Sequence, residues 1–110
     1  MIIDCHGHYT TAPKELEDYR RRQLGALGAG QGVSEKGTLA ISDDQIRASL
    51  EGAQLRMQRE RGTDLTIFSP RASAMGHHLG NAATSRTWSE HCNELIHRVC
   101  RLYPKNFAGV

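Results

Sequence analysis

The chain has 110 residues, of which 38% are hydrophobic and 5% aromatic, and its formal net charge is +2 with the histidines neutral. This length suits one small domain, but so few large apolar side chains argue against a complete, self-sufficient core. The small net charge indicates no nucleic-acid partner, and Asp4 interrupts the N-terminal apolar run before a signal peptide or membrane span can form.

The cysteine pattern points to reduced thiols. Cys5, Cys92 and Cys100 cannot all pair within the chain, and none belongs to a C-x-x-C unit. This pattern favours free cysteines over a disulfide framework, a zinc knuckle or a redox motif. We therefore expect a cytoplasmic protein.

The chain begins with a predicted strand. Residues 1–5 are rich in β-branched side chains, and they lead into His6, Gly7 and His8, as expected of a buried strand that opens into a loop at its carboxyl end. Cys5 points away from the two histidines in this pattern, and we expect it to fill space in the core.

A helix and an irregular segment follow. Pro13 precedes a predicted helix over 14–23, which has carboxylates near its start and arginines near its end, as the helix dipole favours. Residues 25–39 contain five glycines and little periodicity. We expect this stretch to be a flexible loop or an insertion between helices.

A second helix is predicted to begin after Ser42, because Ser42 and Gln45 have the spacing of a capping box. Its apolar residues recur at helical spacing and predict one continuous helix as far as Arg61, which Gly62 ends. The predicted buried face of this helix consists of Ile46, Leu50, Ala53 and Met57.

The remaining residues predict a strand, a helix and a strand. Residues 64–68 form the second strand, and Thr84 or Ser85 can cap the next helix, which ends before Pro104. Residues 107–110 begin a third strand. The apolar stripe of the last helix is predicted to be Trp88, Cys92, Leu95, Val99 and Leu102.

Strands that alternate with helices predict parallel β-α-β units and an α/β fold. The order is compatible with the N-terminal part of a (β/α)₈ TIM barrel or with a doubly wound sheet, and periodicity does not separate the two. We treat residues 1–110 as one incomplete domain, because its last apolar residues stop within a predicted strand.

His6 and His8 are the clearest candidate functional residues. They lie two positions apart at the end of a strand, so their side chains point to the same side and can bind one metal ion. Imidazole nitrogen suits zinc, iron or manganese. A catalytic zinc site usually has three protein ligands and a water, so at least one further ligand must come from elsewhere.

The H-x-H motif after the first strand resembles the metal-binding motif of the amidohydrolase superfamily. The likeness extends over residues 1–14, 60–73 and 92–95, which look like the 4-oxalomesaconate hydratases, and it fails mainly within 25–39. The resemblance implies a TIM barrel with its active site at the carboxyl ends of the strands, of which this chain is about the N-terminal third. It also implies one divalent metal ion, for which we expect Zn²⁺, bound by His6 and His8.

By resemblance, the complete enzyme is a hydro-lyase of aromatic-compound breakdown. It adds water to 4-oxalomesaconate, in the enol form 4-carboxy-2-hydroxymuconate, and gives 4-carboxy-4-hydroxy-2-oxoadipate. The acid/base residue is expected outside these 110 residues, so the segment alone should be inactive. A decarboxylase or hydrolase on the same barrel, or a non-catalytic fragment, are the alternatives. The sequence does not determine the oligomeric state, and it is compatible with a homo-oligomer.

The implied substrate is a small tricarboxylate, which needs cationic and hydrogen-bonding partners. Arg71 directly follows the second strand, and its guanidinium can bind a carboxylate with two parallel hydrogen bonds. Ser69 and Ser73 offer hydroxyls to the same carboxylate, and His77 or His78 can contact the substrate or carry protons.

Asp4 shares the parity of the two histidines on the first strand but lies deeper. A carboxylate in this position can orient a metal ligand without binding the ion itself. The role of Asp4 stays ambiguous at this point, and orienting His6 or His8 is one candidate role.

Overall fold

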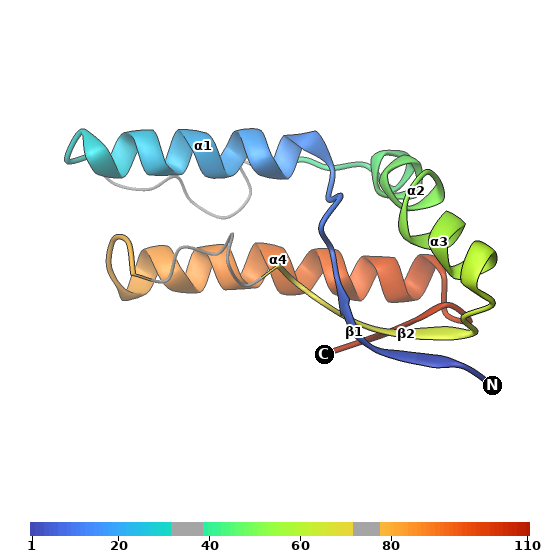
Figure 1. Ribbon diagram of the computed structural model, residues 1–110. Helices are drawn as coiled ribbons and strands as arrows, with labels where there is room; N and C mark the ends of the chain where they lie inside the picture. The colour runs from blue at the N-terminus through green and yellow to red at the C-terminus, as the bar shows by residue number, and fades with distance from the viewer. Residues whose placement is uncertain (32–38, 72–77) are drawn as a thin grey trace.

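The computed structural model describes residues 1–31, 39–71 and 78–110, and it has mixed α/β architecture (Figure 1). No helix within these ranges has the length and apolar character needed to cross a membrane. The elements in chain order are β1 (Ile3–His8), α1 (Lys14–Gly28), α2 (Asp43–Glu51), α3 (Gln54–Arg61), β2 (Leu65–Ser69), α4 (Ala82–Leu102) and β3 (Phe107–Gly109).

The three strands form one parallel sheet in the order β1-β2-β3. Neighbours in sequence are thus neighbours in space, with helices in the connections, as in the N-terminal part of a TIM barrel. In the first pairing His8 lies opposite Ser69, and the register shifts between Asp4 and Gly7. The carboxyl ends of β1 and β2 therefore meet at one edge of the sheet.

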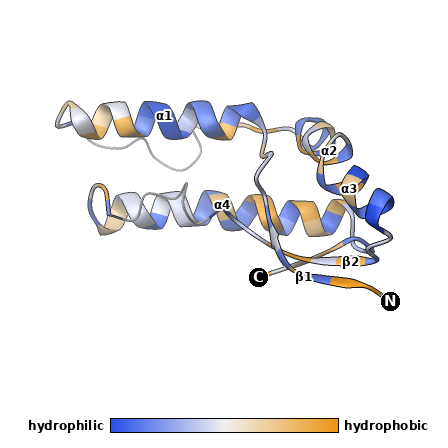
Figure 2. Cartoon of the chain, viewed as in Figure 1, coloured by the Kyte–Doolittle hydropathy of each residue, from blue (hydrophilic) through white to orange (hydrophobic). Residues whose placement is uncertain are grey.

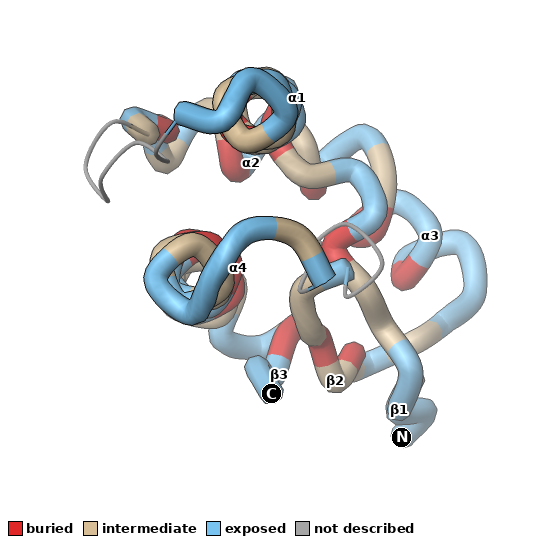
Figure 3. The backbone as a smooth tube through the Cα atoms, turned by 90° about the vertical axis from the view of Figure 1, so that its left-hand side faces the viewer, coloured by how far each residue is buried: buried red, intermediate tan, exposed pale blue. Residues whose placement is uncertain are grey.

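The two faces of the sheet differ in burial. Thr66, Phe68 and Phe107 point to the face covered by helices and are at most 5% exposed. Ile67 and Ser69 point the other way and are only half-buried. Figure 3 shows buried positions on β2 and β3, whereas β1 is exposed over most of its length. The described helices thus cover one face and leave the other open.

The main core lies between the sheet and α2, α3 and α4. Ile46, Leu50, Phe68 and Val99 are fully buried there. A smaller cluster joins α1 to α4, where the rings of Tyr19 and Trp88 stack with centroids 6.2 Å apart. Because α1 and α4 run side by side beyond the sheet, this cluster fixes the spacing of the two helices (Figures 1 and 3).

The capping box predicted at Ser42 is confirmed. The Ser42 hydroxyl accepts a hydrogen bond from the backbone N–H of Gln45 at 3.1 Å, and the Gln45 side chain accepts one from the N–H of Ser42 at 2.7 Å. The next residue, Asp43, accepts two hydrogen bonds from the Arg98 guanidinium, at 2.6 and 3.1 Å. These contacts fix the start of α2 against α4.

Two predicted boundaries are wrong. The first helix does not end at residue 23 but runs to Gly28, so the start of the expected glycine-rich loop is helical. The last helix is capped by Asn81, whose side chain accepts from the N–H of Thr84 at 3.1 Å, and not by Thr84 or Ser85. Asn81 is the better cap because its carbonyl reaches the free N–H three residues on.

The predicted helix from Ser42 to Arg61 is divided into α2 and α3 by a break at Gly52 and Ala53. Gly62 ends α3 in the left-handed conformation, as predicted, with φ of 68°. Met57 does not lie on a buried face and is 42% exposed. The side chains that α3 buries include Gln54 and Gln58, whose hydrogen bonds replace apolar packing.

The buried glutamines connect α3 to the strands. Gln58 donates to the Thr66 hydroxyl at 2.7 Å and to the carbonyl of Asn106 at 2.9 Å, and it accepts from the Asn106 side chain at 3.0 Å. These bonds satisfy the polar atoms that burial removes from water. An apolar periodicity in the sequence does not reveal these contacts.

Cys5 is exposed, so its predicted place in the core is wrong for the described part of the chain. The reason is the position of β1 at the edge of the sheet, where only its last residues are partly covered. Figure 2 shows the apolar start of β1 at this open edge, where Ile2 and Ile3 are 56% and 48% exposed.

Candidate metal centre

His6 and His8 lie together at the carboxyl end of β1, on the open face of the sheet. Their Nε2 atoms are 3.2 Å apart, and the two rings meet edge to face with centroids 4.7 Å apart. The register shift between Asp4 and Gly7 lies just before them, as is common where a strand must aim side chains at a site. The common orientation predicted for the two side chains is confirmed.

The spacing of the pair fits two ligands of one ion. Two nitrogens on a tetrahedral zinc ion, each about 2.0–2.1 Å from the metal, lie about 3.3 Å apart. The two Nε2 atoms have nearly this separation. Within the described ranges no group of three or more His, Cys, Asp and Glu side chains could hold an ion. The described residues thus offer two side chains with the spacing of metal ligands, and a zinc site of the usual kind would need at least one more.

Three side chains hold the strand end that carries the pair. The carboxylate of Asp4 accepts from the backbone N–H of His6 at 3.0 Å, so it supports the backbone of this residue rather than its ring. The hydroxyl of Ser69 lies 2.7 Å from Nδ1 of His8. Gln54 donates to the carbonyl of His8 at 3.4 Å and accepts from the Thr11 hydroxyl at 2.6 Å.

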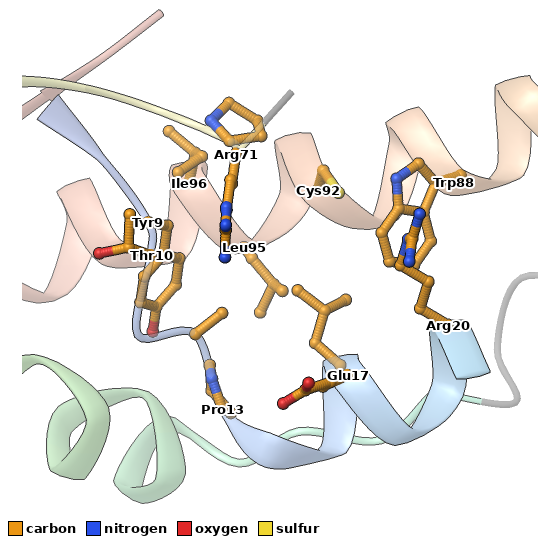
Figure 4. A pocket seen from close by; sticks show the side chains of 13 residues that line it. Tyr9, Thr10, Pro13, Glu17, Arg20, Arg71, Trp88, Cys92, Leu95 and Ile96 are labelled. Carbon is orange, nitrogen blue, oxygen red and sulfur yellow. The ribbon is translucent and has the colours of Figure 1, made fainter. Parts of the chain in front are cut away.

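A cavity of about 320 Å³ lies beside this strand end, between α1 and α4. Thr10 and Arg71, which follow β1 and β2, line it together with Arg20 of α1 and Trp88 of α4. Figure 4 shows Arg71 reaching into the cavity from the side of β2, while Arg20 lies against Trp88, 5.9 Å from its ring centroid. The cavity therefore has two cations on its wall.

Two further wall residues are unsuited to acid/base work near neutral pH. Burial raises the pKa of Tyr9 to about 12, against a smaller lowering by its hydrogen bond to Ser49. Burial likewise raises the pKa of the Cys92 thiol to about 11. Both groups stay protonated at neutral pH, so they shape the cavity without carrying charge.

The other predicted site residues are distributed as follows. Ser69 touches His8, Arg71 lines the adjacent cavity, and His78 is exposed in a turn before α4. Ser73 and His77 lie outside the described residues. The structure thus brings Ser69 to the histidine pair and Arg71 to the cavity.

Sequence reasoning missed Gln54, Arg20 and Trp88 as parts of this region. Gln54 falls outside the apolar stripe that predicted its helix, and no local motif marks it. Arg20 belongs to a run of arginines that resembles a solvated helix face. Only the packing of α1 against α4 brings it to Trp88.

A strand that ends in a pair of histidines with the spacing of metal ligands, at the carboxyl edge of a parallel sheet flanked by helices, is an arrangement typical of metal-dependent barrel enzymes. The chain belongs to the amidohydrolase family, which it matches over residues 3–110. Members of this family typically use a metal ion.

Two individual proteins give a more specific comparison than the family does. The whole chain is 52% identical to 2-keto-4-carboxy-3-hexenedioate hydratase of Sphingobium sp. (strain NBRC 103272 / SYK-6). It also superposes over its full length on the crystal structure of 4-oxalomesaconate hydratase from Rhodopseudomonas palustris, with a TM-score of 0.90 and 50% identity. In both comparisons the chain spans 32% of the relative's length.

Proposed function

We propose that the full-length protein is a metal-dependent hydratase, which adds water to 4-oxalomesaconate to give 4-carboxy-4-hydroxy-2-oxoadipate. The observation that carries the proposal is the 3.2 Å contact between the Nε2 atoms of His6 and His8, in a chain half-identical to two hydratases. This pair offers two lone pairs to one ion at the edge of the sheet where barrel enzymes place their active sites.

In this proposal His6 and His8 bind one divalent ion, for which zinc is the best match in ligand type and spacing. When bound, such an ion can polarise a substrate oxygen or lower the pKa of a water molecule towards about 7. Neighbouring side chains hold the two histidines in position. Asp4 holds the backbone of His6, and Gln54 holds the carbonyl of His8.

Arg71 is proposed to bind a carboxylate of the tricarboxylate substrate. Its guanidinium is exposed and reaches the cavity next to the strand that carries the histidines. A planar guanidinium binds a carboxylate at two points, through two parallel hydrogen bonds. We also propose that the enzyme is cytoplasmic, because its three cysteines are free and thiols stay reduced in that compartment.

The test uses the complete gene product. The purified protein, with its metal content measured, is incubated with 4-oxalomesaconate, and the product is identified by mass and NMR. We expect the gain of one water. Loss of carbon dioxide would instead assign a decarboxylase, and hydrolysis of an amide or ester would assign a hydrolase; either result contradicts the proposal.

The metal is tested in the same preparation. Chelation should abolish turnover, and added zinc should restore it. Replacing His6 or His8 with Ala should lower both bound metal and turnover at least tenfold, which is the size seen even for residues that only support a ligand. Full metal occupancy in the His6→Ala, His8→Ala double variant would remove the proposed metal centre.

A further inference from the structure

The Ser69 hydroxyl lies between two groups of the strand that carries the histidine pair. Its Oγ atom is 2.7 Å from Nδ1 of His8 and 3.2 Å from the carbonyl oxygen of Gly7. Ser69 is the last residue of β2, and it stands opposite His8 in the parallel register. The contact therefore follows from the pairing of β1 with β2.

The protons in this arrangement can be counted. A hydroxyl has one proton to donate, and a carbonyl oxygen can only accept. When Ser69 donates to Gly7, its oxygen accepts from Nδ1–H of His8. Nδ1 of His8 then carries the ring proton, and Nε2 keeps its lone pair, which faces Nε2 of His6 at 3.2 Å.

We propose that Ser69 is a positioning residue, which holds His8 in the Nδ1–H tautomer and presents Nε2 to the metal ion. The inference rests on the proposed binding of an ion by His6 and His8. Metal-bound histidines almost always donate their second N–H to an oxygen, and this contact fixes both the tautomer and the ring orientation. The Ser69 oxygen supplies that contact here.

The backbone of Ser69 is itself held in place. Its carbonyl oxygen accepts from the N–H of Tyr9 at 3.0 Å, so β1 and β2 remain paired one residue beyond His8. On the other side, Gln54 holds the carbonyl of His8. The backbone atoms of both Ser69 and His8 are therefore held by hydrogen bonds, and these bonds fix the position of the Ser69 hydroxyl relative to the His8 ring.

This role differs from the carboxylate binding that the sequence predicted for Ser69. In the proposed arrangement its single proton goes to the carbonyl of Gly7 and its oxygen accepts from His8, so no donor remains for a substrate carboxylate. A positioning role acts on metal affinity, whereas a substrate-binding role acts on KM. The two roles are therefore separable by measurement.

The test compares Ser69→Ala, Ser69→Thr and Ser49→Ala in the full-length enzyme. The zinc dissociation constant is measured by competition with a chelator. We expect Ser69→Ala to weaken zinc binding about 10- to 100-fold, and Ser69→Thr to restore much of it, because the hydroxyl is retained. Ser49→Ala removes a hydroxyl bonded to Tyr9 at the same strand end, so it controls for general loosening.

A second measurement follows the tautomer directly. In zinc-loaded protein with ¹⁵N-labelled histidine, His8 should show a protonated Nδ1 and a metal-bound Nε2 in the wild type. KM for Ser69→Ala at saturating zinc should equal that of the wild type. Unchanged zinc affinity in Ser69→Ala, an equal loss in Ser49→Ala, or a raised KM at full metal occupancy would each overturn the inference.

Failure of the proposed function is recognised separately. If the wild type and the His6→Ala variant bind zinc equally, the pair holds no ion, and both proposals fall. If His6→Ala loses zinc and Ser69→Ala does not, the metal centre stands and only the role of Ser69 is refuted.

Discussion

Gly7 packs so closely against Thr66 that a side chain at position 7 would clash with it. A Cβ atom on Gly7 would lie 2.1 Å from Cγ2 of Thr66 and 2.9 Å from the carbonyl oxygen of Ile67. The absence of a side chain thus lets β1 approach β2 between the two histidines. Since side chains alternate along a strand, His6 and His8 face the opposite side of the sheet, toward the proposed ion.

Replacing Gly7 with Ala should therefore separate β1 from β2. Overpacking of this kind typically costs about 1–3 kcal/mol, and the shift should also weaken zinc binding, because His8 moves relative to Ser69. Gly25→Ala is the matched control, since Gly25 lies within α1 and a Cβ there meets no atom within 4 Å. That variant should be neutral or more stable by up to about 1 kcal/mol. Urea midpoints and zinc affinity of the full-length variants check both expectations, and wild-type values for Gly7→Ala contradict them.

Arg71→Ala should reduce kcat/KM by roughly 10- to 150-fold, because it removes a charge-assisted contact of about 1.5–3 kcal/mol. Metal content should stay unchanged. Arg71→Lys should recover only part of the loss, since an ammonium lacks the planar two-point contact. Arg56→Ala is the control, because Arg56 is an exposed arginine on α3 that pairs with Glu60. A wild-type kcat/KM in Arg71→Ala would return Arg71 to an ordinary surface role.

Asp43 should contribute stability that depends on pH. Its pKa is lowered, first by the hydrogen bond from Arg98 and further by the nearby charges of Arg98 and Arg101. Because the pKa is lowered in the folded state, the stabilisation by Asp43 is complete above the unfolded-state pKa of about 3.9. It is lost as the pH falls through the lower pKa of the folded state. Asp43→Asn should thus be less stable than the wild type at neutral pH, and the difference should shrink in acid.

The control for this titration is Asp44→Asn. Asp44 is the neighbouring residue at the start of α2, but its side chain is 93% exposed, against 35% for Asp43. Exposed ion pairs contribute little, so Asp44→Asn should have a smaller effect. Urea midpoints from neutral pH down to a pH of about 2 give the comparison. A constant gap between the wild type and Asp43→Asn would contradict the role of the ionised carboxylate.

Residues 1–110 expressed alone should lack a cooperative fold. Both β1 and β3 have an open edge in the three-stranded sheet, and Ile2 and Ile3 are 56% and 48% exposed. Exposed apolar edge strands pair with other chains, so aggregation is the expected result. Size-exclusion chromatography and thermal unfolding provide the measurement. A soluble monomer with a sharp melting transition would show that the prediction is wrong.

Much of the fold followed from the sequence because its strands and its last helix carry clear patterns. The apolar stripe from Trp88 to Val99 is buried as predicted, and Gly62 ends α3 as predicted. The break between α2 and α3 was not predictable in this way. Beyond the break α3 buries Gln54 and Gln58 through hydrogen bonds to other elements, so the apolar period through Ala53 and Met57 predicted the wrong face.

The site was predictable to a similar extent. Strand alternation alone places His6 and His8 on one side, which the contact between their rings confirms. The contact of Ser69 with His8 depends on the register of β1 against β2, across 61 residues of sequence. No local pattern specifies this register, so the sequence offered Ser69 only as a loop hydroxyl near the substrate.

During synthesis the ribosome releases the N-terminus first. His6, His8 and Ser69 all belong to β1 and β2, so every described group of the centre has been made once β2 is complete. The two histidines are separated by a single glycine, and closing so short a loop around an ion costs little chain entropy. In the proposed centre, the relative positions of His6, His8 and Ser69 are therefore set as soon as β1 pairs with β2.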